Sequence, residues 1–82
     1  MSENTFQTAD LYYAAFLRVA GVPYLDAVRG NGGRVQFVFE HPGVSVLRDL
    51  KQGYFTDRAK VSALSFVQAV RLMKTIVHSV ES

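Results

Sequence analysis

Apolar residues recur with a helical period in the first part of the chain. Tyr12, Phe16 and Val19 stand at i, i+4 and i+7 within residues 9–20, which is the spacing of one face of an α-helix. The hydroxyl of Thr8 can accept a hydrogen bond from a free backbone N–H of the first turn, so we expect Thr8 to cap this helix. The pattern therefore predicts a helix over residues 9–20.

Two further helices are predicted in the second half of the chain, and glycines mark helix ends. Residues 44–52 predict a short helix that Gly53 should end, and Ser62 is a suitable N-cap for a last helix over about residues 63–80. Gly21 stands where a residue in the left-handed conformation would end the first helix.

Two segments between the first and second helices have the composition of β-strands. Residues 22–29 and 34–40 are rich in β-branched and aromatic side chains, and residues 30–33, which include three glycines, separate them. In the second segment, every other residue is apolar. We therefore expect an antiparallel hairpin with one face turned to the core.

The register of this hairpin can be argued from its side chains. A two-residue turn would place Asp26 opposite Phe37 and put a carboxylate on the buried face. An odd-numbered loop avoids this and sets Leu25 opposite Phe37 and Ala27 opposite Val35. We predict an odd-numbered loop, most simply a three-residue turn with a glycine in the left-handed position of a bulge.

These elements indicate an α+β fold in a single small domain of order α-β-β-α-α, with a two-stranded antiparallel hairpin packed against helices. At 82 residues there is room for one domain. We expect a flexible leader over residues 1–7 and the domain over residues 8–80. With 49% hydrophobic residues, the chain is not expected to be disordered. No apolar stretch approaches the roughly 20 residues of a membrane helix, and the polar N-terminus does not resemble a signal peptide, so a cytoplasmic protein is expected.

The chain lacks the residue patterns of most catalytic and metal sites. It has no cysteine, which excludes a disulfide framework, a zinc finger, an iron–sulfur site and a cysteine nucleophile. His41 has no second ligand at a helical metal-site spacing, and His78 has only Glu81 at such a spacing, which is too few ligands for a metal site. The glycines of residues 30–33 lead into a strand, whereas a phosphate loop leads into a helix. We expect no enzymatic activity, no catalytic residue, no bound metal and no cofactor.

Basic residues are concentrated in the later part of the chain. Residues 1–28 carry one arginine and three acidic residues, a balance of −2, whereas residues 29–82 carry eight basic and four acidic residues, a balance of +4. Because Lys and Arg contacts to phosphates dominate nucleic-acid affinity, such residues could form a nucleic-acid surface. The candidate contacts are Arg29, Arg34, Arg58, Lys60, Arg71 and Lys74.

Apolar side chains extend around the last predicted helix beyond a single face. A helix that is apolar over most of its circumference is usually buried on two sides, and in a small domain the second side can be another copy of the chain. Alternatively, the other helices cover it completely. The outward face of the hairpin is also apolar. We expect a homodimer, with these candidate self-association residues: Leu64, Leu72, Ile76, Tyr24, Val28 and Val38.

A resemblance to a known family covers nearly the whole chain, from about residue 6 to residue 78. It is carried by the string Phe6-x-Thr8-x-Asp10-Leu11-Tyr12-x-Ala14-Ala15-Phe16-Leu17, by Gly21 and a hairpin ending in Val35-x-Phe37-x-Phe39, by Tyr54-Phe55, and by Phe66-x-x-Ala69-x-Arg71-x-x-Lys74. The pattern resembles a family of short bacterial and phage-associated proteins that is classed only as a domain of unknown function. This resemblance implies a prokaryotic or phage setting and a compact domain, and it implies no activity, cofactor or catalytic residue.

We interpret the sequence as a small non-enzymatic protein-interaction module that associates with itself or with another protein through apolar helix or hairpin surfaces. The alternative is a nucleic-acid-binding accessory protein related to a phage or a mobile element. A third interpretation, a small-molecule or enzymatic site, rests only on the number of tyrosines: Tyr12, Tyr13, Tyr24 and Tyr54.

Overall fold

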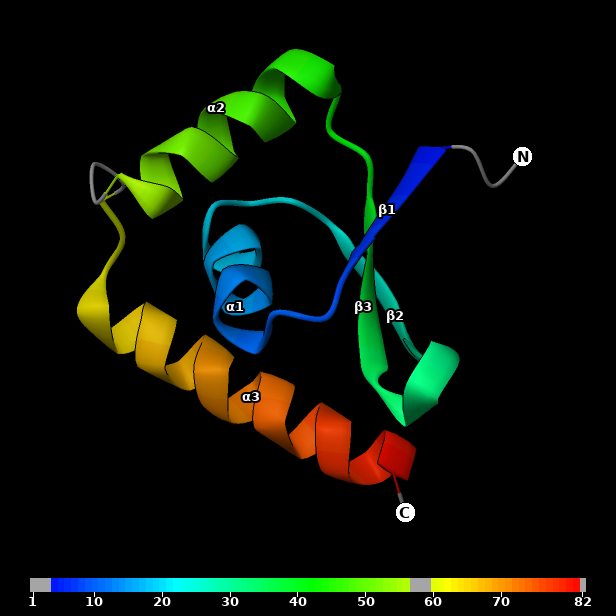
Figure 1. Ribbon diagram of the computed structural model, residues 1–82. Coiled ribbons are helices and arrows are strands. Elements are labelled where there is room, and N and C mark those ends of the chain that lie inside the picture. Colours follow the sequence, from blue (N-terminus) through cyan, green and yellow to red (C-terminus); the bar gives the residue numbers. More distant parts are fainter. Residues whose placement is uncertain (1–3, 57–59, 82) are drawn as a thin grey trace.

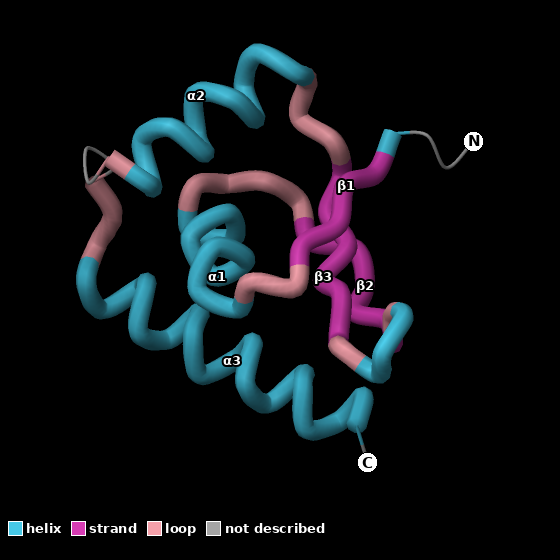
Figure 2. The backbone as a smooth tube through the Cα atoms, in the orientation of Figure 1, coloured by secondary structure: helices cyan, strands magenta, loops and turns pink. Residues whose placement is uncertain are grey.

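The computed structural model describes residues 4–56 and 60–81, and in this part of the chain three α-helices pack on one side of a three-stranded antiparallel sheet (Figures 1 and 2). This arrangement confirms the α+β class and the predicted helix-strand-strand-helix-helix order, and it adds a strand before the first helix. The elements are β1 (Thr5–Thr8), α1 (Leu11–Val19), β2 (Tyr24–Arg29), the 3₁₀ turn η2 (Asn31–Gly33), β3 (Val35–Glu40), α2 (Val44–Phe55) and α3 (Ala63–Glu81).

The additional strand, β1, forms from residues that the sequence predicts as a flexible leader over residues 1–7. Thr5–Thr8 pairs antiparallel with β3, and Phe6 lies opposite Phe39. The ring of Phe6 packs 6.2 Å from the ring of Phe39 and 6.4 Å from the ring of Tyr13. Burial of this aromatic side chain attaches the segment to the sheet. The strand order is β1-β3-β2, so β1 is an edge strand.

Helix α1 begins later than predicted because Thr8 belongs to β1. The N-cap is Asp10, whose carboxylate accepts a hydrogen bond from the backbone N–H of Tyr13 at 3.0 Å. The hydroxyl of Thr8 accepts from the backbone N–H of Asp10 at 3.1 Å and so supports the cap from outside. The helix ends as predicted at Gly21, which has a φ of +95° and donates its N–H to the carbonyl of Arg18 at 3.1 Å.

The hairpin confirms the odd-numbered loop but not the pairings proposed with it. The loop is the three-residue turn Asn31–Gly33. The predicted pairings require a loop one position earlier in the chain, over residues 30–32. Ala27 therefore lies opposite Phe37 and not opposite Val35. An irregularity at Leu25 then shifts the register by one residue near the start of β2.

This shift turns Tyr24 toward the core, although the sequence predicts Tyr24 on the outward face of the hairpin. Tyr24 lies opposite Phe39, and the two rings meet edge to face at 5.7 Å. The guanidinium of Arg18 lies over the Tyr24 ring, 5.1 Å from its centre. The prediction for Tyr24 is wrong because one extra residue in a strand moves the preceding side chains to the opposite face.

Helix α2 continues past Gly53, where the sequence predicts its end, and reaches Phe55. The ring of Tyr54 lies 5.2 Å from each of the rings of Tyr13 and Phe16, and this packing outweighs the low helix propensity of glycine. Of the two aromatic residues at this end of α2, Tyr54 is half-buried and Phe55 is exposed.

Helix α3 begins as predicted, after Ser62, whose hydroxyl accepts from the backbone N–H of Ser65 at 3.3 Å. It lies across α1 and against β2 and β3, and its buried residues are Ala69 and Met73. The largest fully buried side chains of the protein come from the sheet, α1 and α3: Phe37, Phe39, Leu17 and Met73.

Candidate functional site

Helix α2 is the most exposed helix of the fold. None of its twelve residues is buried, although a surface helix usually buries an apolar stripe against the core. Its inner side contacts the core only through half-buried side chains, among them Leu50 and Tyr54. Its other side exposes 75% of Val44 and 62% of Phe55. The helix therefore presents apolar surface that no described residue covers.

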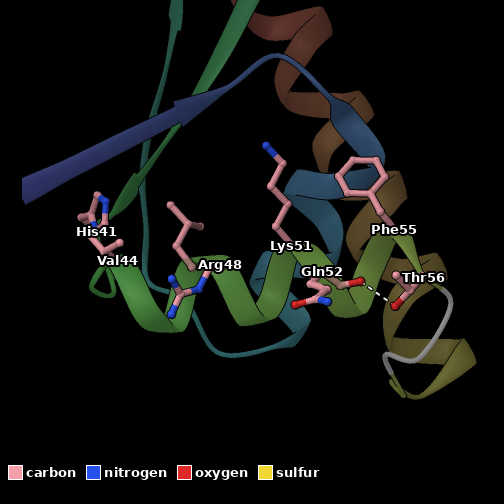
Figure 3. A pocket seen from close by; sticks show the side chains of 8 residues that line it. His41, Val44, Arg48, Lys51, Gln52, Phe55 and Thr56 are labelled. Atoms are coloured by element: carbon pink, nitrogen blue, oxygen red, sulfur yellow. Dashed lines mark hydrogen bonds between the residues drawn. The ribbon is translucent and has the colours of Figure 1, made fainter.

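A cavity of about 620 Å³ follows this exposed side of α2 (Figure 3). The side chains that line it recur every three or four residues along the helix, so they form one continuous row about 18 Å long. They include Val44, Leu47, Arg48, Lys51 and Phe55.

A second cavity, of about 310 Å³, lies between α2 and β1. From α2 it shares three lining residues with the first cavity: Leu47, Lys51 and Phe55. From β1 it is lined by Phe6, Gln7 and Thr8. In Figure 3, the side chains of Lys51 and Phe55 extend from α2 toward the side on which the blue strand β1 crosses. We call the two adjoining cavities the α2–β1 groove.

The wall of the groove formed by β1 is an open sheet edge. The backbone N–H of His41 donates to the carbonyl of Asn4 at 2.6 Å, and alternate residues of an antiparallel strand bond to the same neighbour. Phe6 and Thr8 therefore bond toward β3, and the backbone N–H and carbonyl of Gln7 point away from it. The edge thus offers one donor and one acceptor at Gln7.

The larger cavity has a cationic lining. Arg48 and Lys51 both line it, and no carboxylate of the described residues does. His41 lies at the end nearest the start of α2, where its Nδ1 accepts a hydrogen bond from the backbone N–H of Gly43 at 3.0 Å. A carboxylate, Asp10, lines only the smaller cavity, where it also caps α1. The groove is therefore apolar and positively charged along α2.

Tyr13 lines the smaller cavity and carries an unsatisfied polar group. Its side chain is 5% exposed, and its buried hydroxyl has no hydrogen-bond partner among the described residues. Burial raises the pKa of Tyr13 above its ordinary value of 10.0, and the negative charge of Asp10 raises it further. Because buried polar groups are nearly always hydrogen-bonded, this unsatisfied hydroxyl lowers the stability of the folded protein.

The predicted self-association residues do not form one surface. Leu64 and Leu72 on α3 are 67% and 42% exposed, but their directions around the helix differ by about 80°. Ile76 and Tyr24 are half-buried and pack against the core, so only part of each side chain is free for the predicted self-association, which stays a prediction. The remaining two lie on the side of the sheet opposite the buried phenylalanines: Val28 and Val38.

The predicted nucleic-acid contacts are spread along the molecule. Arg29 and Arg34 flank the hairpin turn, and the guanidinium of Arg29 donates to the backbone carbonyl of Glu81 at 3.3 Å. This contact joins the hairpin to the C-terminal end of α3 (Figure 1). Lys60 precedes the other end of α3, and a helix of 19 residues separates the two ends by about 28 Å.

Arg71 and Lys74 are exposed on α3, and Arg58 lies outside the described residues. The cations that line the groove are two that the sequence interpretation leaves out, Arg48 and Lys51. Their i, i+3 spacing on a predicted helix was visible in the sequence. What was not visible is that this side of the helix remains uncovered.

Other kinds of site find little support in the structure. Three of the four tyrosines pack in or against the core and the fourth, Tyr12, is 50% exposed, so they do not line one cavity. Within residues 4–56 and 60–81, no three His, Asp or Glu side chains are grouped in a way that could hold a metal ion. No helix in these ranges has the length and apolar character needed to cross a membrane.

Comparisons with known proteins do not identify a function, so functional inference rests on the geometry of the site. The resemblance to a family of short bacterial and phage-associated proteins stays a hypothesis. No family model, no curated protein and no solved structure matches the chain.

Proposed function

We propose that the protein is a small non-enzymatic protein-interaction module and that a segment of another protein binds in the α2–β1 groove. The observation that carries the proposal is the uncovered apolar side of α2, on which Val44 and Phe55 are 75% and 62% exposed. Complete burial of one such side chain contributes about 1.5–3 kcal/mol, so a partner that covers both gains a substantial driving force. Loss of translational and side-chain freedom offsets part of this gain.

The charges on α2 favour a different protein over a second copy of the chain. In a two-fold dimer through α2, two antiparallel helices would meet near their centres. The cations Arg48 and Lys51 lie on either side of the centre of α2, so Arg48 of one copy would face Lys51 of the other, which places like charges together. A contact between the groove and another surface of the same chain would be heterologous and would lead to rings or open filaments, not to a two-fold dimer.

Two interpretations of the sequence are less well supported by this geometry. A homodimer through α3 or the hairpin stays a prediction, which the mass in solution tests, but its candidate residues are dispersed or turned to the core. Nucleic-acid binding also stays a prediction, and its described candidate residues are distributed from one end of α3 to the other. Neither has a single surface comparable with the groove.

Site-specific photocrosslinking in the cells that naturally produce the protein tests the proposal. A benzophenone amino acid replaces Val44 in the groove or, as a control, Leu64, which is 67% exposed on α3. We expect one partner polypeptide to be crosslinked from position 44 and not from position 64. The adduct should be lost when Phe55→Asp is added, and the purified partner should bind the wild type and not Phe55→Asp.

Three results would contradict the proposal. They are the absence of any adduct from position 44, the same adducts from both positions, and a product made of two copies of this chain. Circular dichroism of Phe55→Asp confirms that the variant is folded before its result is used.

A further inference from the structure

We infer that the segment bound in the α2–β1 groove is acidic and extended, and that it adds to the outer edge of β1 with its carboxylates against Lys51 and Arg48. The inference rests on the proposed function, because it names the chemistry and conformation of the partner of the same groove. It is carried by two features: the charge of the lining and the open edge of β1.

The lining charges select an acidic partner. Arg48 and Lys51 stand beside the exposed apolar side chains of α2, and no carboxylate among the described lining residues of the larger cavity neutralises them. Complementary charges across an interface steer association and exclude partners of the wrong sign. A segment with both apolar and acidic side chains matches a groove that offers apolar surface and two cations together.

The open edge of β1 selects an extended conformation. A bound strand obtains affinity from main-chain hydrogen bonds to a sheet edge and specificity from pockets that receive alternate side chains. The N–H and carbonyl of Gln7 point away from β3 and provide such hydrogen bonds. The cavity beside Gln7 is lined by the same Leu47, Lys51 and Phe55 that line the larger cavity, so a strand on this edge lies within reach of α2.

Peptide titrations monitored by NMR of the isotope-labelled full chain test the inference. The probes are three synthetic peptides of about eight residues, longer than β1. One alternates Glu and Val, one alternates Lys and Val, and one has the first peptide's composition in a helical order. We expect the alternating Glu–Val peptide to bind most tightly and to shift the amide signals of Gln7, Leu47 and Lys51.

Two pairs of variants separate the contributions. Lys51→Glu should weaken binding about tenfold or more, whereas Lys74→Glu, an equal charge change on the exposed side of α3, should not. Gln7→Pro should weaken binding about tenfold or more, because proline has no N–H, whereas Gln7→Ala keeps the N–H and should bind as the wild type does. Neither change at Gln7 removes a hydrogen bond to β3, so both variants should fold.

Each opposing result rejects a defined part of the inference. Equal binding of the Lys–Val peptide rejects the acidic partner. Wild-type affinity of Gln7→Pro, or tighter binding of the helical peptide, rejects strand addition. If no peptide binds with a dissociation constant below about 1 mM but the crosslink from position 44 persists, the inference fails and the proposed function stands. If the crosslink is also absent, both fail.

Discussion

Replacement of Tyr13 by phenylalanine should make the protein more stable, although Tyr13 is part of the core. The ring centre of Tyr13 lies 6.3 Å from that of Phe16 and 5.2 Å from that of Tyr54, and phenylalanine keeps both contacts. The change removes only the hydroxyl, which is buried without a described partner. A buried unsatisfied polar group costs about 1–3 kcal/mol, and we expect Tyr13→Phe to recover about 1 kcal/mol of the free energy of unfolding.

Chemical and thermal denaturation followed by circular dichroism measure this effect. A gain of about 1 kcal/mol corresponds to a rise in Tm of about 4–8 °C for a domain of this size. In urea, the midpoint should rise while the slope of the transition stays unchanged, because the surface exposed on unfolding is nearly the same. The matched control is Tyr12→Phe, which removes the same hydroxyl from a side chain that is 50% exposed and should change stability by less than about 0.5 kcal/mol.

A loss of more than about 0.5 kcal/mol in Tyr13→Phe would refute this reasoning, because it would show that the hydroxyl makes a stabilising hydrogen bond in the free protein. An equal gain in Tyr12→Phe would show that the effect does not depend on burial.

Three further predictions concern the core, the helix cap and the pH dependence. Met73→Ala should lower the free energy of unfolding by about 2–5 kcal/mol in urea titrations, because the Met73 side chain is fully buried. The control is Leu72→Ala, which should lower it by less than about 1 kcal/mol because Leu72 is 42% exposed. Similar losses in the two variants would contradict the described packing of α3 against the core. Asp10→Ala should lower the free energy of unfolding by about 1 kcal/mol. Asp10→Asn should lower it by less, because the amide oxygen also accepts from the N–H of Tyr13. Equal losses in the two variants would contradict the capping role of Asp10. Burial raises the pKa of Tyr13, Tyr24 and Tyr54 above 10.0, and nearby carboxylates raise it further. A group whose pKa is higher in the folded state stabilises the fold at a pH below the unfolded pKa. This stability is lost as the pH rises through the folded pKa. Urea midpoints should therefore fall between about pH 9 and pH 12, and a flat profile would count against this coupling.

Local patterns in the sequence predict the helices and the hairpin well. The apolar period of α1, the left-handed Gly21 after it and the N-cap Ser62 of α3 all act within a few residues of the chain. The glycine-rich turn is equally local, and its three-residue length follows from keeping Asp26 off the buried face. These features depend on backbone geometry and short-range hydrogen bonds, so the order of residues along the chain is enough to indicate them.

The candidate site depends on contacts between distant segments. A four-residue strand has little pattern of its own, and β1 exists because Phe6 packs on Phe39, far along the chain. Without β1, the sheet edge beside α2 is not predictable, and neither is the groove lined by Leu47 and Lys51. The sequence predicts interaction surfaces on α3 and the hairpin, because α3 is apolar over most of its circumference, but the fold covers part of α3 and leaves α2 exposed.

The sequence by itself determined the class of fold, the order of its main elements and the absence of cysteine chemistry, because each depends on composition or on spacing within one element. Only the tertiary structure decided that Tyr24 faces the core, that α2 continues past Gly53 and that one side of α2 is uncovered. The physical reason is the same in each case. An apolar side chain is buried by whichever segment can reach it, and that segment is selected by packing across the whole molecule and not by its neighbours in the chain.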